Sequence, residues 1–237
     1  MKSHCVKCGE DPNKYLFKDE DVAESDITPY VGYNYCDNCE EKTWFVANNV
    51  GVPKKYANVT FGNYITQREK LSSFGLSQDE IIKIVKVKEK VQDLIEYISK
   101  GSSIRILFYG KPGTGKTLLA TASINSLSQD GHTTELISAN QLLYGCMDTE
   151  NYVNIIKGLS DKTLVVIDDF TDVTNSDFTK RVMHDVIDGT YSNLTSLIIT
   201  TNLTIESLNN MLSPGSLDRM NEGIGGSIFF NWKSFRK

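Results

Sequence analysis

A glycine-rich stretch of the chain has the residue types and the spacing of a loop that binds phosphate groups. It reads Gly110-Lys111-Pro112-Gly113-Thr114-Gly115-Lys116-Thr117 and matches the pattern G-x-x-x-x-G-K-[ST] at every fixed position. The glycines let backbone N–H groups and a helix N-terminus meet negative charge. We predict that Lys116 neutralises the β- and γ-phosphates of ATP and that the Thr117 hydroxyl ligates Mg²⁺. Contacts with ATP or ADP are expected along the whole stretch and at Leu118, which follows it.

Two carboxylates at the end of an apolar run are the expected second half of this site. Asp168 and Asp169 directly follow Leu164-Val165-Val166-Ile167, which has the composition of a buried strand. Asp168 is predicted to hold Mg²⁺ through water, and Asp169 to orient or deprotonate the attacking water. Many ATPases with such a glycine-rich loop carry Glu where this chain has Asp169. The shorter Asp side chain reaches less far into the site. The rate of hydrolysis therefore stays open.

Asn202 is a third candidate for the same site because it ends another buried strand, Ser196-Leu-Ile-Ile-Thr-Thr-Asn202. We predict that its side-chain amide contacts the γ-phosphate and helps to position water. The alternative is structural, with Asn202 or Thr204 turning the chain and capping the next helix.

Four of the five cysteines form two pairs, Cys5-x-x-Cys8 and Cys36-x-x-Cys39, with the spacing of a four-thiolate zinc site. The 27 residues between the pairs exceed the roughly 15–20 of the short zinc template, so this loop is expected to carry a strand or turn of its own. A module this small has too little core to stand alone, and Zn²⁺ would stabilise it. The alternatives are two disulfides, which a cytosolic setting disfavours, or four unrelated thiols. Cys146 is expected to be an ordinary core or half-buried residue.

The scaffold that must position these residues is predicted to be an α/β fold with a parallel sheet flanked by helices. After Gly101, apolar strands alternate with amphipathic helices, as is typical of that architecture. A long helix precedes them, from a capping box at Ser77 and Glu80 up to Gly101. Strands are predicted near residues 104–109, 134–138, 164–168, 196–200 and 227–230. We divide the chain into a zinc-binding module (1–45), a linker and lead-in segment (46–75) and an ATPase domain (76–237).

Composition and charge narrow the class of protein. The 237 residues are 40% hydrophobic and 23% charged, as in an ordinary soluble domain, and no apolar run reaches the roughly 18 residues of a membrane span. The start of the chain lacks the apolar region of a signal peptide, so a cytosolic protein is expected. Residues 1–50 hold five Lys and ten Asp or Glu, which accounts for the whole net charge of −5. Such an acidic module suits a protein partner better than nucleic acid.

Two further motifs resemble those of a known family. They are Ser216-Leu-Asp-Arg219-Met220 and Phe230-Asn-Trp-Lys-Ser-Phe-Arg236. Together with the glycine-rich loop, the Asp-Asp and Thr-Thr-Asn sequences and the stretch from Val52 to Tyr64, they are similar to bacterial helicase loaders of the DnaC and DnaI type. The resemblance covers about residues 50–237, and the four-cysteine module resembles that of the DnaI branch. It implies the fold of a P-loop ATPase of the AAA+ class.

The resemblance implies roles for two arginines. Arg219 matches the arginine finger, which is offered to the γ-phosphate of the neighbouring subunit. Arg236 matches the second sensor arginine, which contacts nucleotide within its own subunit. A guanidinium suits both roles because it stabilises charge spread over phosphoryl oxygens. The alternatives are a surface ion pair of Arg219 with Asp218 or Glu222 and, for Arg236, a merely basic end of the chain.

The resemblance also implies partners and a function. The zinc module would bind the replicative helicase hexamer, and the ATPase domains would associate into an ATP-dependent ring or spiral. A helical element at residues 139–159 would line a path for single-stranded DNA, with Tyr144, Tyr152 and Lys157 as candidate contacts. Because the chain has no basic surplus, this binding is expected to be local and weak.

The implied function is ATP-dependent loading of a replicative helicase onto single-stranded DNA during replication initiation. It would take place in the cytoplasm of a bacterium or, for a phage protein, of its host. Two alternatives stay open. One is an ATPase of the IstB type, which assists transposition, and the other is a nucleotide-binding switch with little turnover.

Overall fold

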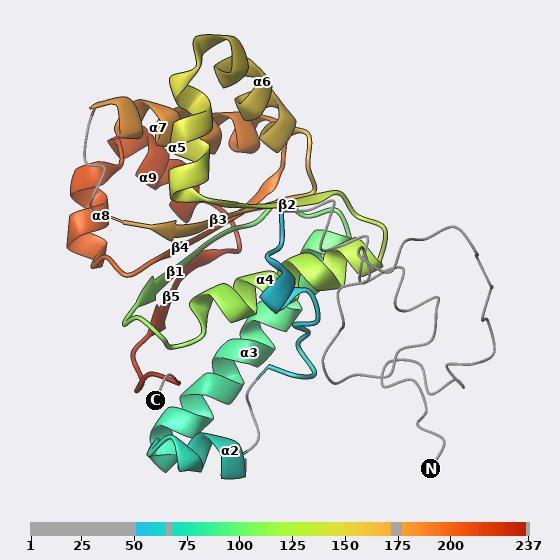
Figure 1. Cartoon of the computed structure of the whole chain (residues 1–237), viewed down its shortest axis with the longest axis vertical. Helices are drawn as coiled ribbons and strands as arrows, with labels where there is room; N and C mark the ends of the chain where they lie inside the picture. Colours follow the sequence, from blue (N-terminus) through green and yellow to red (C-terminus); the bar gives the residue numbers. More distant parts are fainter. Residues whose placement is uncertain (1–50, 65–67, 172–176, 236–237) are drawn as a thin grey trace, which may run out of the picture.

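The structure is a computed structural model that describes residues 51–64, 68–171 and 177–235 (Figure 1). The two predicted cysteine pairs and Arg236 lie outside these ranges, so the zinc site and the role of Arg236 stay predictions. In the ranges that are described, no helix is both long enough and apolar enough to cross a membrane.

Five parallel strands form the centre of the molecule, in the order β2-β3-β4-β1-β5. Their bounds are β1 (Arg105–Gly110), β2 (Thr134–Ser138), β3 (Leu164–Phe170), β4 (Ser196–Thr201) and β5 (Gly226–Phe230). The order places β1, β3 and β4 inside the sheet, where both faces are covered and near-continuous apolar runs are the norm. The parallel sheet predicted from the sequence is confirmed.

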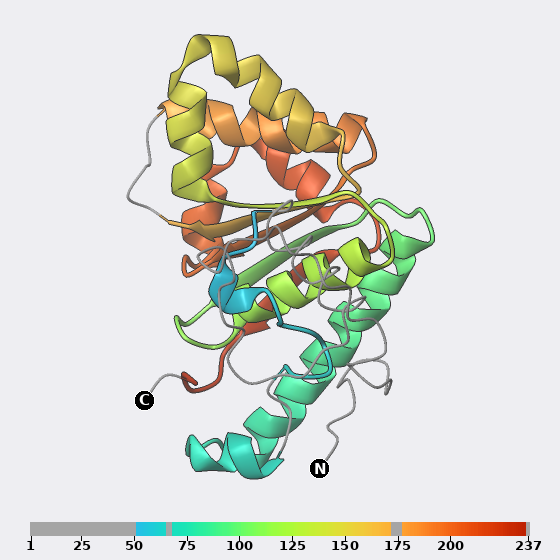
Figure 2. The same ribbon diagram turned by 45° about the vertical axis from the view of Figure 1, so that its right-hand side comes forward.

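Helices cover both faces of the sheet (Figures 1 and 2). One face packs against α3 (Gln78–Ser99) and α4 (Lys116–Gln129). The other packs against α5 (Ala139–Met147), α6 (Thr149–Ser160), α7 (Asp177–Ser192), α8 (Ile205–Met211) and α9 (Pro214–Asn221). Because successive strand residues point to opposite faces, Val166 belongs to the first core and Val165 to the second.

Local sequence explains where the long helix α3 begins. The Ser77 hydroxyl accepts a hydrogen bond from the backbone N–H of Glu80, and the Glu80 carboxylate accepts one from the N–H of Ser77. This capping box satisfies two backbone donors at the helix start. The predicted capping box is therefore confirmed, and the buried face of α3 carries the apolar residues that recur at helical spacing.

The lead-in segment, residues 51–64, packs onto the domain rather than standing apart from it. It contains a short 3₁₀ helix, η2 (Lys54–Tyr56), and is followed by α2 (Arg68–Ser73). Val52, Phe61 and Tyr64 are buried in the same core as α3 and α4. The amide nitrogen of Asn125, a buried residue of α4, lies 3.2, 3.1 and 2.7 Å from the carbonyl oxygens of Tyr56, Ala57 and Val59. Asn125 therefore anchors the segment to α4.

Replacing Asn125 by leucine is expected to lower the free energy of unfolding by about 2 kcal/mol, because three carbonyl oxygens lose their buried donor while side-chain volume is kept. Urea unfolding would measure the change. The matched control is Asn154→Leu at an exposed position of α6, expected to change stability by no more than about 0.5 kcal/mol. Equal effects at the two positions would contradict an anchoring role for Asn125.

Candidate nucleotide-binding site

A cavity of about 480 Å³ opens at the carboxyl ends of β1, β3 and β4. Ligands bind at this edge in open parallel sheets, and the volume is within the usual range for small-molecule sites. The cavity is lined by residues from the glycine-rich loop, the two strand ends, the lead-in segment and the chain after β5. They are Pro53, Lys55, Tyr56, Pro112, Gly113, Gly115, Lys116, Thr117, Leu118, Asp168, Asp169, Thr200, Asn202 and Phe235.

The glycine-rich loop has a backbone that requires glycine at two positions in particular. Gly110 has φ 130°, and a Cβ there would lie 2.4 Å from the carbonyl oxygen of Phe230. Gly115 has φ 93°, and its Cβ would lie 2.8 Å from the Tyr64 hydroxyl and 2.9 Å from the Phe235 ring. Helix α4 begins directly after Gly115, so its N-terminal N–H groups lie at the loop, where phosphate groups are predicted to bind.

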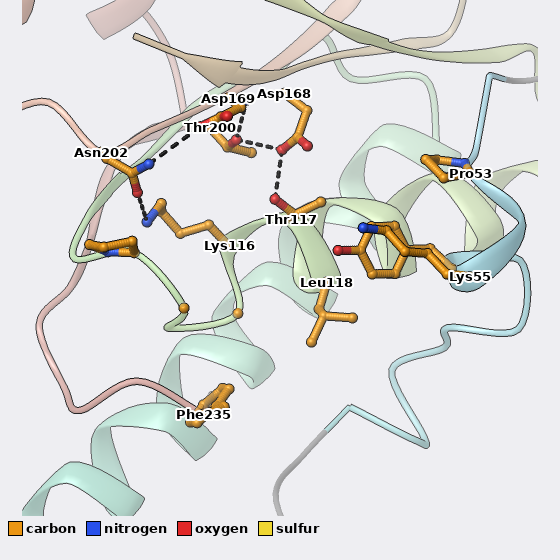
Figure 3. Close-up of a pocket in the computed structure, with 14 residues that line it drawn as sticks. Pro53, Lys55, Lys116, Thr117, Leu118, Asp168, Asp169, Thr200, Asn202 and Phe235 are labelled. Carbon is orange, nitrogen blue, oxygen red and sulfur yellow. Dashed lines mark hydrogen bonds between the residues drawn. The ribbon is translucent and has the colours of Figure 1, made fainter. Parts of the chain in front are cut away.

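Lys116 is buried, and its ammonium group lies within the curve of the loop. Its Nζ donates to the carbonyl oxygens of Gly110 at 2.9 Å and Lys111 at 2.7 Å, and to Oδ1 of Asn202 at 2.7 Å (Figure 3). The side chain is thus extended into the cavity, where its charge can meet a phosphate. Of these three partners, Gly110 and Lys111 belong to the loop itself, whereas Asn202 directly follows β4.

Thr117 and Asp168, the two predicted magnesium ligands, lie side by side. The Thr117 hydroxyl donates to Oδ1 of Asp168 at 2.8 Å, and the Thr200 hydroxyl donates to the same oxygen at 2.6 Å. A hydroxyl, a carboxylate and phosphate oxygens are the hard donors that Mg²⁺ takes, with water completing the shell. The donor set therefore fits Mg²⁺. Thr200 was not predicted as a site residue. Its position near the carboxyl end of β4, where ligands bind in parallel sheets, could have indicated it.

Asp169 has an unusual backbone conformation that directs its side chain toward Asn202. Its φ is 56°, in the left-handed region, at an irregularity in the pairing of β3 with β4 between Ile167 and Phe170. Its N–H donates to the Thr200 hydroxyl at 2.9 Å, and its Oδ1 accepts from the Asn202 amide at 3.3 Å. Backbone strain of this kind is concentrated at functional sites. Asp169, Asn202 and Lys116 thus form one hydrogen-bonded chain across the cavity (Figure 3).

Asn202 and Thr204 have separate tasks. The Thr204 side chain accepts from the N–H of Ser207 and caps helix α8, whereas the Asn202 side chain contacts Lys116 and Asp169. The capping alternative applies to Thr204. Asn202 lines the cavity beside the Lys116 ammonium group, and its contact with the γ-phosphate stays a prediction.

Two walls of the cavity were not predicted as nucleotide contacts. The lead-in segment contributes Pro53, Lys55 and Tyr56, with the Lys55 Nζ 4.5 Å from the centre of the Tyr56 ring. The chain after β5 contributes Phe235. Apolar and aromatic residues of this kind suit the base and sugar of a nucleotide. The only signal in the sequence was the similarity of both segments to helicase loaders, which named no role for these residues.

Arg219 lies outside this cavity, on α9. Its guanidinium pairs with Asp188 at 2.9 Å and lies 5.5 Å from the centre of the Tyr191 ring. Arg105, the first residue of β1, lies over the same ring, whereas the glycine-rich loop begins at Gly110, the last residue of β1. Arg219 is therefore at the amino edge of the sheet, away from the nucleotide cavity of its own chain. Its ion-pair partner is Asp188, not the Asp218 or Glu222 that we considered.

The residues considered for DNA contact lie on α5 and α6, also away from the cavity. Tyr144 is 72% exposed, and Lys157 is exposed. Tyr152 is half-buried and donates to Asp185 of α7 at 2.6 Å. Burial and this carboxylate raise the pKa of Tyr152 to about 12. Tyr152 therefore ties α6 to α7, and Tyr144 is the more accessible ring. Cys146 is buried in α5, as predicted.

The chain is similar to known proteins in both sequence and fold. The chain is 26% identical to the replicative helicase loader DnaC of Escherichia coli (strain K12) over 194 residues, which cover 80% of this chain and 74% of that protein. The crystal structure of the DnaC helicase loader matches with a TM-score of 0.59 at 20% identity, over 76% of this chain and all of that one. The crystal structure of DnaI matches with a TM-score of 0.59 at 12% identity, over 78% of this chain and 94% of that one.

At these identities the two solved structures show the fold alone. The structure of AMPPCP-bound DnaA from Aquifex aeolicus shares it too, with a TM-score of 0.55 at 19% identity, and there the match covers 74% of this chain and 50% of that one. The profile of the ATPase family associated with various cellular activities (AAA) matches residues 106–225, which include the glycine-rich loop, both carboxylates, Asn202 and Arg219. The chain therefore belongs to the AAA family of ATPases.

Proposed function

We propose that this protein is an ATP-dependent helicase loader, which binds the replicative DNA helicase and helps to place it on single-stranded DNA during replication initiation. The observation that carries the proposal is the alignment with the loader DnaC, which runs over 194 residues and extends well beyond the 120 residues of the family match. Helicase loading would take place in the cytoplasm of a bacterium or of a phage-infected cell.

In this proposal, ATP binding and hydrolysis control when the helicase is released. Lys116 and the loop N–H groups bind the phosphates, and Thr117 together with Asp168 would hold Mg²⁺, which supplies charge neutralisation. Asp169 accepts the proton of the attacking water or orients it, and Asn202 holds both Asp169 and the terminal phosphate in place. Hydrolysis would then release the helicase.

The remaining parts of the proposal concern partners. Cys5, Cys8, Cys36 and Cys39 bind Zn²⁺, and the module that they stabilise contacts the helicase hexamer. Copies of the ATPase domain associate into a ring or spiral, in which Arg219 reaches the neighbouring nucleotide and Arg236 the nucleotide of its own chain. Tyr144 and Lys157 provide a weak, local contact to single-stranded DNA.

The test is a pull-down of the cognate replicative helicase by the full chain, with ATP and with ADP, followed by the mass of the complex. We expect several copies per helicase hexamer, and we expect the complex to be lost when residues 1–45 are removed. Cys5→Ser/Cys8→Ser is the finer variant, expected to lose one Zn²⁺ per chain together with the complex. No complex with either nucleotide would reject the loader function and favour an ATPase of the IstB type or a switch with another partner.

Replacing Arg219 by alanine is expected to leave the ATP dissociation constant within about twofold, because Arg219 lies outside its own cavity, and to lower ATP turnover in the assembly at least tenfold. Phosphate release at saturating protein concentration measures the turnover. Arg181→Ala, at an exposed position of α7, is the matched control and is expected to have little effect. Unchanged turnover in the Arg219 variant would contradict the arginine-finger role and leave this arginine a structural role on α9.

A further inference from the structure

The chain directly after β5 folds back onto the glycine-rich loop. The indole N–H of Trp232 donates to the carbonyl oxygen of Thr114 at 3.0 Å. The backbone N–H of Phe235 donates to the carbonyl oxygen of Gly113 at 2.8 Å. Two successive carbonyl groups of the loop are therefore held by residues more than a hundred positions away in the sequence, from a segment that the AAA family match does not include.

Trp232 is placed firmly enough to act as a fixed donor. Its side chain is 1% exposed, and its ring lies 5.0 Å from that of Phe230, which in turn lies 5.2 Å from that of Phe108. Thr114, which receives the hydrogen bond, is fully buried, and its own hydroxyl donates to the carbonyl oxygen of Lys111 at 2.8 Å. Both ends of the bond are thus fixed by packing.

The neighbouring contacts leave the loop little room to shift. The Phe235 ring and the Tyr64 hydroxyl both lie so close to Gly115 that a Cβ could not be added there. Figure 3 shows Phe235 on the opposite side of the loop from Asp168 and Thr200. The loop is therefore enclosed between the chain after β5 on one side and the strand ends on the other.

The hydrogen bonds to the two carbonyl groups also determine where the loop N–H groups point. In a planar trans peptide the C=O and the N–H point in opposite directions. The peptide between Thr114 and Gly115 turns its oxygen toward the indole, so the N–H of Gly115 points away from it. By the same argument, the N–H of Thr114 points away from Phe235. If the Thr114 peptide turned over, a carbonyl oxygen would face the space where an anion must bind.

We propose that Trp232 is a positioning residue for phosphate binding: its indole N–H holds the Thr114 peptide in the orientation in which the loop N–H groups face the nucleotide phosphates. The proposal concerns the nucleotide site of the ATPase domain and does not depend on helicase loading. The proposed role of Trp232 differs from that of Arg236, which is predicted to contact the nucleotide directly.

The test is Trp232→Phe, which keeps an aromatic ring in the core but removes the N–H donor together with part of the ring system. Dissociation constants are measured by calorimetry with Mg²⁺ for two ligands, ATP and inorganic tripolyphosphate. Both constants are expected to rise by about tenfold, equivalent to about 1.4 kcal/mol. The equal rise is the specific result, because tripolyphosphate lacks the base and sugar and reports on the phosphate-binding loop alone.

The matched control is Phe108→Leu, which disturbs the same aromatic core without touching a donor to the loop. It is expected to lower the melting temperature and to leave both dissociation constants within about twofold. If Trp232→Phe lowers the melting temperature but leaves tripolyphosphate binding unchanged, Trp232 is a core residue only and the proposal is overturned. A loss confined to ATP would overturn it too, since the defect would then lie at the base or sugar.

A second variant covers the case in which Trp232→Phe does not fold. Benzothienylalanine at position 232, in a Trp44→Phe background, keeps the bicyclic shape of tryptophan and replaces its N–H by sulfur. Weakened binding of tripolyphosphate by the folded protein supports the proposal, and binding equal to that of the Trp44→Phe protein contradicts it.

Discussion

Replacing Lys116 by alanine is expected to raise the ATP dissociation constant at least a hundredfold. The ammonium group is already held inside the loop by the carbonyl oxygens of Gly110 and Lys111 and by Asn202. Hydrogen bonds to charged groups contribute about 1.5–3 kcal/mol each, and two of them, to the β- and γ-phosphates, correspond to a hundredfold or more in affinity. Titration of a fluorescent ATP analogue, with competition by ATP, measures the change.

The control for this variant is Lys100→Ala, which removes an exposed lysine paired with Glu96 at the end of α3. It is expected to leave ATP affinity unchanged, since Lys100 lies outside the cavity. Micromolar ATP affinity in the Lys116 variant would reject the assignment of the site. A loss of the folded state, visible by circular dichroism, would make Lys116→Gln the variant to measure, with the same expected loss of affinity.

Replacing Asp169 by asparagine is expected to lower kcat for ATP hydrolysis about a hundredfold while ATP affinity changes little. An amide cannot accept a proton from water, and general-base catalysis contributes typically 10²–10⁴-fold. Asparagine tolerates the left-handed backbone at this position as well as aspartate does, so the site geometry should be kept. Steady-state phosphate release measures kcat, and Asp161→Asn, at an exposed position that ends α6, is the control.

Asp169→Glu then distinguishes a working ATPase from a nucleotide-binding switch. If the short aspartate makes the native protein a slow switch, the longer glutamate should increase turnover strongly. If aspartate already supports hydrolysis, glutamate should bring no gain, because the left-handed backbone at Asp169 is less favourable for a longer side chain. Full turnover in Asp169→Asn would contradict the role of Asp169 altogether.

The sequence determined the parts of this protein that depend on local pattern. The spacing from Gly110 to Thr117 requires one particular loop, and apolar runs that end in Asp168 and Asn202 predict buried strands with polar ends. The capping box at Ser77 and Glu80 likewise acts between residues one helical turn apart. Each of these is a short-range relation between side chain and backbone, so it can be read without knowing the packing. The zinc site and Arg236 stay predictions from the same kind of pattern and from resemblance.

Only the tertiary structure decided how distant segments complete the site. Pro53 and Tyr56 reach the cavity because Asn125 of α4 anchors their turn, and Phe235 reaches it because Trp232 packs under the loop. The Thr200 hydroxyl donates to Asp168 and accepts from the N–H of Asp169. Both contacts form where the pairing of β3 with β4 is irregular.

Arg219 pairs with Asp188 rather than with its neighbours in sequence because α9 packs against α7. These contacts depend on which faces of helices and strands are buried together. That is a property of the whole core, and no local spacing specifies it.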